Sequence, residues 1–111
     1  MAVKKYSENN WKEVQSGVFR KIVHLNNLMT VMVEFRNGPW RVAEPFHSHP
    51  HEQTCYIASG EIILYCEGEP DQHLTEGDLF YVASDVKHTI KVLTPMVRLI
   101  DNFTPLREDF L

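Results

Sequence analysis

The chain has 111 residues, the length of one domain, and we expect residues 1–111 to form a single domain. Its formal net charge of −4, without a run of lysine and arginine, argues against a nucleic-acid partner. No N-terminal apolar run resembles a signal peptide, and no later segment is apolar and long enough to span a membrane. We therefore expect a cytoplasmic protein with no membrane partner.

Short apolar segments of strand length, rich in β-branched and aromatic residues, recur along the chain. They are residues 18–23, 29–35, 54–58, 61–66, 78–82, 89–93 and 96–100. Turn-forming pairs such as Ser59-Gly60 and Thr94-Pro95 separate them. A clear helical period is missing apart from a short turn expected near residues 7–14, and residues 102–111 form an irregular tail. The pattern predicts an all-β domain, either a sandwich or a small barrel.

Histidines gather just before Gln53, in the sequence His47-Ser48-His49-Pro50-His51, and a lone His88 follows later in the chain. His47, His49 and Gln53 share parity, so they would project from one face of an extended chain. Three imidazoles and an amide oxygen suit a divalent zinc, nickel, iron or copper ion, whereas magnesium and calcium prefer oxygen cages. No motif selects among these ions. Taken alone, the His-x-His pair could equally be part of a solvated loop.

The same residues fall in the order and spacing of the two cupin motifs. The residues that resemble the first motif are His47, His49, Gln53 and Gly60, and those that resemble the second are Gly77 and His88. The resemblance implies a cupin-type β-barrel (a double-stranded β-helix or jelly roll) and one metal ion. The metal ligands that it implies are His47, His49, Gln53 and His88.

The chain departs from the cupin motifs at Ala83 and Asp85, where proline and glycine are frequent, and at Gln53, where many members have glutamate. The first two changes concern turn geometry. A neutral amide at Gln53 leaves the charge of the ion uncompensated, which favours a Lewis-acid role over an oxygen-activating iron site.

The other histidines and the cysteines are expected to have structural roles. His51 is interpreted as a loop residue beside the ligands, His73 as part of a solvated face, and His24 as a turn residue. Cys55 and Cys66 lie in consecutive predicted strands, and we expect reduced, buried thiols.

The C-terminal tail narrows the resemblance within the cupins. Residues 101–111, with Phe103, a Thr-Pro pair and Arg-Glu-Asp-Phe, resemble the ending of the KdgF-like cupins of pectin degradation. Residues 17–22, 28–29 and 47–53 stand in the same order as in that family, whereas residues 38–45 differ. The resemblance implies an enzyme that converts cyclic 4,5-unsaturated monouronates, the products of pectate and alginate lyases, to the linear ketone.

The resemblance also implies roles for the tail residues. Asp101 shares a face with apolar residues of its predicted strand and is the candidate proton carrier, with a strand-end aspartate bonded to backbone amides as the alternative. Arg107 could neutralise the substrate carboxylate or pair with Glu108 or Asp109 of the tail. Phe103 and Gln53 are expected beside the substrate, and core packing is the alternative for Phe103.

Two other functions stay open. One is another metal-dependent cupin enzyme, such as a dioxygenase, a sugar isomerase or a polyketide cyclase, because this fold hosts many chemistries. The other is a non-catalytic domain that binds or senses a small molecule. In each case we expect a homodimer, since exposed edge strands are safer when they are covered.

Overall fold

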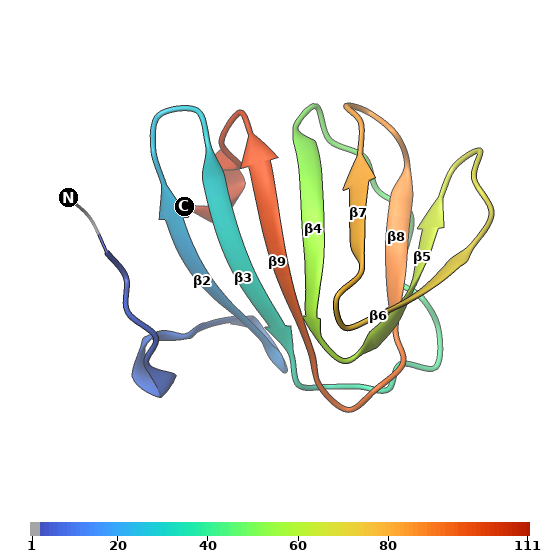
Figure 1. Ribbon diagram of the computed structural model, residues 1–111, viewed down its shortest axis with the longest axis horizontal. Helices are drawn as coiled ribbons and strands as arrows, with labels where there is room; N and C mark the ends of the chain where they lie inside the picture. The colour runs from blue at the N-terminus through green and yellow to red at the C-terminus, as the bar shows by residue number, and fades with distance from the viewer. Residues whose placement is uncertain (1–2) are drawn as a thin grey trace.

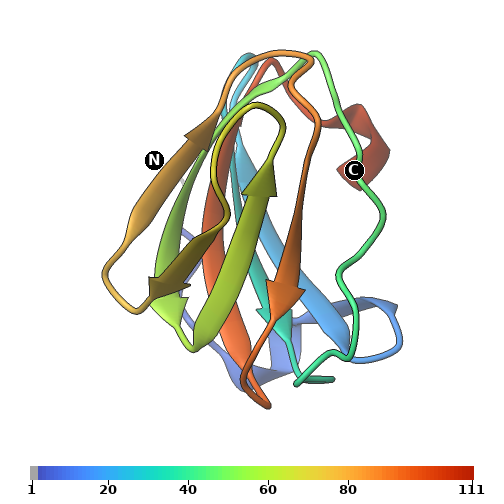
Figure 2. The same ribbon diagram turned by 90° about the vertical axis from the view of Figure 1, so that its right-hand side faces the viewer.

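The computed structural model describes residues 3–111, which form two antiparallel sheets that face each other (Figures 1 and 2). The elements run in the order η1 (Glu8–Asn10), β1 (Lys12–Gln15), β2 (Val18–His24), β3 (Met29–Phe35), β4 (Glu52–Ser59), β5 (Glu61–Cys66), β6 (Gln72–Thr75), β7 (Leu79–Val82), β8 (His88–Val92), β9 (Val97–Thr104) and η2 (Glu108–Phe110). The larger sheet has the order β1-β2-β3-β9-β4-β7 and the smaller one β6-β5-β8. The predicted all-β class is confirmed.

Period-2 alternation decides which side chains face the interior. In β9 every second residue is buried, from Val97 through Leu99 and Asp101 to Phe103. The neighbouring strand β3 lies antiparallel with Val31 opposite Asp101. The inward orientation predicted for Asp101 is therefore present, with the carboxyl group in an otherwise apolar row.

The core consists of two groups of buried apolar side chains. One includes Ile57 and Ile62, which are fully buried, and the other includes Met29, Val31 and Phe103. Burial of such a side chain contributes about 1.5–3 kcal/mol to stability. The second group lies beneath the C-terminal tail and forms one wall of the site described below.

The strand boundaries differ from the expected ones at several places. Two short strands, β1 and β6, were not predicted, and β4 and β9 extend to Ser59 and Thr104. The expected turn at residues 7–14 is the single turn η1, and the tail contains the turn η2. Among residues 3–111 there is no helix with the length and apolarity needed to cross a membrane.

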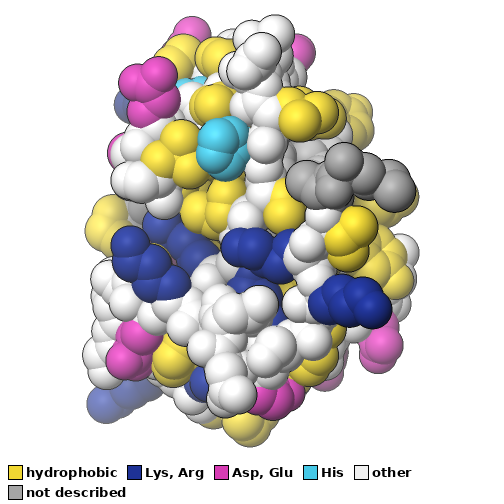
Figure 3. All heavy atoms as spheres, turned by 90° about the vertical axis from the view of Figure 1, so that its left-hand side faces the viewer, with side chains coloured by type: hydrophobic (Ala, Val, Ile, Leu, Met, Phe, Trp, Pro, Cys, Tyr) yellow, Lys and Arg dark blue, Asp and Glu magenta, His cyan; other side chains and the backbone are white. Residues whose placement is uncertain are grey.

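The segment before β2 packs on the outer face of the larger sheet. It covers Lys21, whose ammonium group lies 4.2 Å from the ring centroid of Tyr6 and 4.6 Å from that of Trp11. Nearby, Arg98 donates to the buried carboxylate of Glu34 at 2.7 Å. Figure 3 shows Lys and Arg side chains gathered on this side of the molecule. Lys21 and Arg98 are thus engaged in structural contacts.

The turn between β4 and β5 requires glycine. Gly60 has φ +84°, in the left-handed region that side chains other than glycine rarely adopt. A Cβ atom there would also lie 2.4 Å from the carbonyl oxygen of Met96. The predicted Ser59-Gly60 turn is therefore fixed by both backbone conformation and space.

Candidate functional site

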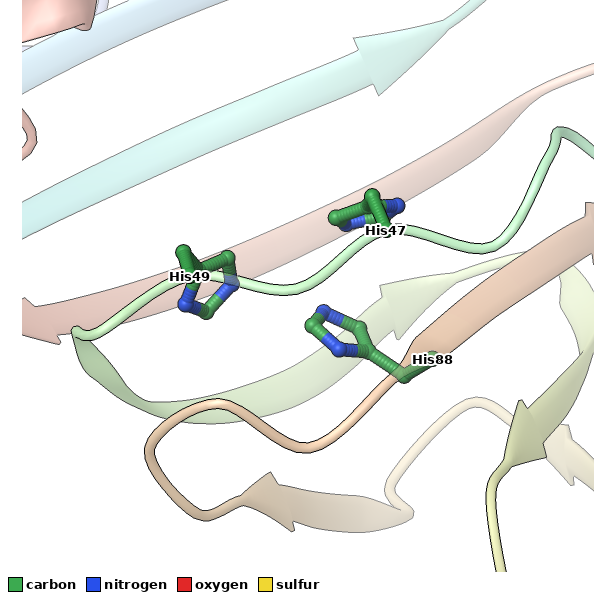
Figure 4. Close-up of side chains that lie close together, drawn as sticks. All are labelled: His47, His49 and His88. Carbon is green, nitrogen blue, oxygen red and sulfur yellow. The ribbon is translucent and has the colours of Figure 1, made fainter.

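Three imidazoles converge where the loop before β4 meets the first residue of β8 (Figure 4). The backbones of His47 and His88 are joined by two N–H to carbonyl hydrogen bonds of 3.0 and 2.9 Å. The bridge sets their rings side by side with centroids 4.3 Å apart, and the ring of His49 lies 4.9 Å from that of His88. One nitrogen of each imidazole lies within 4.8 Å of the other two. This cluster is compatible with a metal site.

Hydrogen bonds set the tautomers of two of these rings. Nδ1 of His49 lies 2.9 Å from the carbonyl oxygen of His51, and Nδ1 of His88 lies 2.9 Å from that of Val86. A carbonyl oxygen only accepts, so each Nδ1 carries the proton and each Nε2 keeps its lone pair. Burial lowers the pKa of His49 and lowers that of His88 to about 4. Both rings are thus neutral at pH 7, the form that binds metal.

Gln53 links the histidines to Asp101. Its Nε2 donates to Oδ1 of Asp101 at 2.9 Å, which leaves Oε1 only 3.2 Å from Nε2 of His49. Two atoms that both offer lone pairs therefore face each other, an arrangement that a cation bound by both would stabilise. A nitrogen-rich donor set with one amide oxygen suits zinc, nickel, iron or copper. The residues of this site fit the expected divalent ion.

Asp101 lies at the inner end of this chain of contacts. It is 7% exposed and sits between Val31 of β3 and Cys55 of β4 in the sheet register. Burial raises the pKa of its carboxyl group, and the hydrogen bond from Gln53 opposes that effect. The expected alternative, a strand-end aspartate bonded only to backbone amides, does not describe this carboxyl group.

His47, His88 and Asp101 line one cavity of about 390 Å³. Six of the seven residues predicted for the site line this cavity: His47, Gln53, His88, Asp101, Phe103 and Arg107. The seventh, His49, contacts Gln53 and packs edge-on against Phe103 at 5.8 Å between ring centroids. Phe103 is 3% exposed, so it is both a wall of the cavity and part of the core.

Arg107 forms one of the two contacts expected for it, the tail ion pair, and its role toward the substrate carboxylate stays a prediction. It lines the cavity, and it forms a two-pronged ion pair with Asp109 through hydrogen bonds of 3.1 and 2.8 Å. This pair lowers the pKa of Asp109. The guanidinium carbon of Arg107 also lies 4.2 Å from the ring centroid of Phe110. The tail thereby covers one side of the cavity.

Further residues line the cavity without being marked by the sequence motifs, among them Arg20, Trp40 and Phe110. Arg20 could have been found, because it shares parity with Val18 and Ile22 in a predicted strand and must face inward with them. Trp40 and Phe110 come from a loop and a single helical turn, which carry no such parity.

The remaining histidines and the cysteines lie outside the metal cluster. Nε2 of His51 donates to the carbonyl oxygen of Leu106 at 3.0 Å, while the carbonyl oxygen of His51 orients His49. His73 is exposed and lies 2.8 Å from Glu61, and His24 is exposed at the end of β2. Cys55 and Cys66 are free thiols in different sheets. Only Cys55 is buried, so the expectation of two buried thiols is wrong for Cys66.

Comparison with known proteins identifies the family. Residues 34–100 match the cupin domain family. The chain is 34% identical over 105 residues to the pectin degradation protein KdgF of Dickeya dadantii (strain 3937), which covers 94% of this chain and 93% of that protein.

Two solved structures have the same fold over nearly their whole length. The structure of KdgF from Halomonas sp. is 35% identical, with a TM-score of 0.81, and the match covers 94% of each chain. A RmlC-like cupin from Shewanella frigidimarina NCIMB 400 is 31% identical, with a TM-score of 0.83 and coverage of 96% of this chain and 94% of that one. The predicted cupin-type barrel is confirmed, and the chain belongs to the cupin domain family and, within it, to the relatives of KdgF.

Proposed function

We propose that this protein is an enzyme that converts cyclic 4,5-unsaturated monouronates from pectin or alginate breakdown to their linear ketone form. The observation that carries the proposal is that imidazoles, the buried carboxyl group of Asp101 and the cationic Arg107 surround one cavity. A sugar acid offers matching groups, namely a carboxylate, hydroxyls and an enol ether. The name of the Dickeya relative, a pectin degradation protein, supports the same substrate class.

His47, His49, Gln53 and His88 would hold the divalent ion. Bound there, a zinc, nickel, iron or copper ion supplies a Lewis acid that orients the substrate and polarises its oxygen atoms. The hydrogen bond from Nδ1 of His49 to the carbonyl oxygen of His51 keeps that ring in the ligand tautomer. Phe103 forms an apolar wall that keeps water away from one side of the sugar ring.

Asp101 would move the proton. Burial raises the pKa of its carboxyl group, which brings proton release and uptake closer to neutral pH. Gln53 holds Oδ1 by its hydrogen bond of 2.9 Å and so fixes the direction of the carboxyl group toward the cavity. Arg107 would face the substrate carboxylate from the tail side of the cavity.

The test is turnover by the Asp101→Asn variant. Asparagine keeps the size and can still accept from Gln53, so metal content and folding should be unchanged while the rate falls by roughly 10²–10⁴. The reaction is followed by the loss of absorbance of the conjugated enol ether of an unsaturated monouronate. Asp71→Asn, at an exposed position outside the cavity, is the matched control and should react at the wild-type rate.

Other outcomes point elsewhere. A wild-type protein that carries its metal but leaves the uronate unchanged would refute the proposed reaction. Turnover that needs oxygen would favour a dioxygenase. A variant as fast as wild type, with its metal in place, would make Asp101 a structural residue.

We also propose that the protein is a homodimer. Tyr56, Leu79 and Tyr81 expose 41%, 73% and 81% of their surface on the outer face of β4 and β7. A groove of about 360 Å³ lies beside them, and β7 is an edge of the larger sheet. Contiguous apolar surface at a sheet edge is typical of an interface. Light scattering at micromolar concentration should give twice the monomer mass, and Tyr81→Glu should give the monomer.

A further inference from the structure

Arg20 is a cavity residue to which the resemblance assigns no role. It lies in β2, opposite Val33 of β3, and lines the cavity with Asp101 and Arg107. It interrupts the inward row of apolar side chains formed by Val18 and Ile22. A guanidinium in such a row needs a partner for its N–H groups or costs stability.

The guanidinium of Arg20 lacks hydrogen-bond and ion-pair partners in the part of the chain that the structure describes. Its Nε is buried and has no hydrogen-bond partner among residues 3–111, and in the same range Arg20 forms no ion pair. The contact that holds the side chain is a stack, with the guanidinium carbon 3.8 Å from the ring centroid of Phe110. Stacking fixes the plane of the group and leaves its edge, where the N–H donors lie, available to a ligand.

Arg107 differs from Arg20 in this respect. Both prongs of its guanidinium bind Asp109, at 3.1 and 2.8 Å. The two arginines pack against the same ring of Phe110. Burial lowers the pKa of Arg20, and the nearby charge of Arg107 lowers it further. Both cations line the cavity, but only Arg107 forms a hydrogen-bonded ion pair, whereas Asp109 and Asp101 act on Arg20 through their charges alone.

We propose that Arg20 binds the carboxylate of the substrate through its unengaged guanidinium edge. The proposal rests on the proposed function, because it takes the substrate to be a sugar acid. Arg20, His47 and His88 line the same cavity, so an acid bound at Arg20 would hold its ring in the cavity that the metal cluster also faces. Arg107 then adds charge from the tail while it remains paired with Asp109.

The experiment measures binding of D-galacturonate, a saturated uronate that the proposed reaction cannot consume, to the metal-loaded protein by calorimetry. Arg20→Gln should weaken binding by roughly 10- to 100-fold, the range for a charge-assisted hydrogen bond. Arg20→Lys keeps the charge but lacks the planar guanidinium, so its affinity should lie between those of wild type and Arg20→Gln. Arg41→Gln removes one exposed positive charge outside the cavity and should bind as wild type does.

A neutral ligand separates recognition from packing. D-galacturonate methyl ester lacks the carboxylate charge. It should bind more weakly than D-galacturonate to wild type, and with the same affinity to wild type and Arg20→Gln. Loss of the stack on Phe110 would instead weaken both ligands together, and that result would overturn the proposal. With unsaturated uronate, Arg20→Gln should raise KM by a similar factor and leave kcat within about threefold.

The two proposals fail in different ways. If wild type turns over the unsaturated uronate and Arg20→Gln binds galacturonate equally well, the role of Arg20 is wrong and the proposed reaction stands. If no turnover occurs but galacturonate binding depends on Arg20, the reaction is wrong and the carboxylate site stands. Wild-type protein that binds no uronate would overturn the role of Arg20.

Discussion

Acid should destabilise the metal-free protein through His88. Burial holds the pKa of this imidazole at about 4, against 6.5 for the ordinary group. Above pH 6.5 the ring is neutral in the folded and the unfolded chain, so it adds no pH dependence. As the pH falls below 6.5, the unfolded chain takes up a proton that the folded chain refuses, and folding becomes less favourable. Below about pH 4 both states are protonated and the loss is complete.

The size of the loss follows from the two pKa values. At about 1.4 kcal/mol for each pH unit between 6.5 and 4, His88 removes about 3 kcal/mol of unfolding free energy. This is a large part of the 5–15 kcal/mol that is typical of a small domain. His49, whose pKa burial also lowers, acts in the same direction.

Urea unfolding of chelator-treated protein, followed by circular dichroism at pH 7 and pH 4, measures the effect. Carboxyl groups titrate over the same range, so the wild type is compared with His88→Gln. In this variant the loss of unfolding free energy between pH 7 and pH 4 should be smaller than in wild type by about 3 kcal/mol. His24→Gln, which replaces an exposed ring, is the control, and its unfolding free energy should change between pH 7 and pH 4 as much as that of wild type. Equal pH dependence in wild type and His88→Gln would refute the reasoning.

Three further predictions concern the ligands, the turn and the tail. His49→Ala should lose most of the bound metal, measured by elemental analysis after dialysis, and unchanged metal content would contradict its role as a ligand. Gly60→Ala should lower the unfolding free energy by about 1–3 kcal/mol in urea, because alanine is strained at φ +84° and meets the carbonyl of Met96. Asp109→Asn breaks an exposed ion pair and frees Arg107 for substrate, so KM for an unsaturated uronate should fall by about two- to fivefold, whereas an increase would show that the pair positions the tail.

Alternation of apolar residues was enough to predict the long strands and the inward face of β9. It failed for β1 and β6, where every residue but Leu74 is exposed, because a strand that buries almost no side chains has no hydrophobic period. These strands form through backbone pairing with β2 and β5. Backbone pairing depends on neighbours distant in the chain and leaves no local pattern.

The candidate site also has features that the sequence predicts and features that depend on tertiary packing. The resemblance to the two cupin motifs predicted the meeting of His47, His49 and His88. The contact that joins His47 to His88, a bridge between a loop and β8, depends on the packing of two sheets. Parity places Arg20 on the inward face of its strand, but the sequence does not show whether an inward guanidinium has a partner. The packing of Phe110 on Arg20 depends on how the tail folds back and has no local signal.

The proposed ligands belong to both sheets, with Gln53 in the larger sheet and His88 in the smaller one, while His47 and His49 lie in the loop between β3 and β4. An ion held by all four would be a removable cross-link at the mouth of the barrel, where His47 and His88 exchange a single pair of backbone hydrogen bonds. Removal of the ion should therefore speed amide hydrogen exchange at this pair well before the amides of Ile57 and Ile62, deep in the core, begin to exchange.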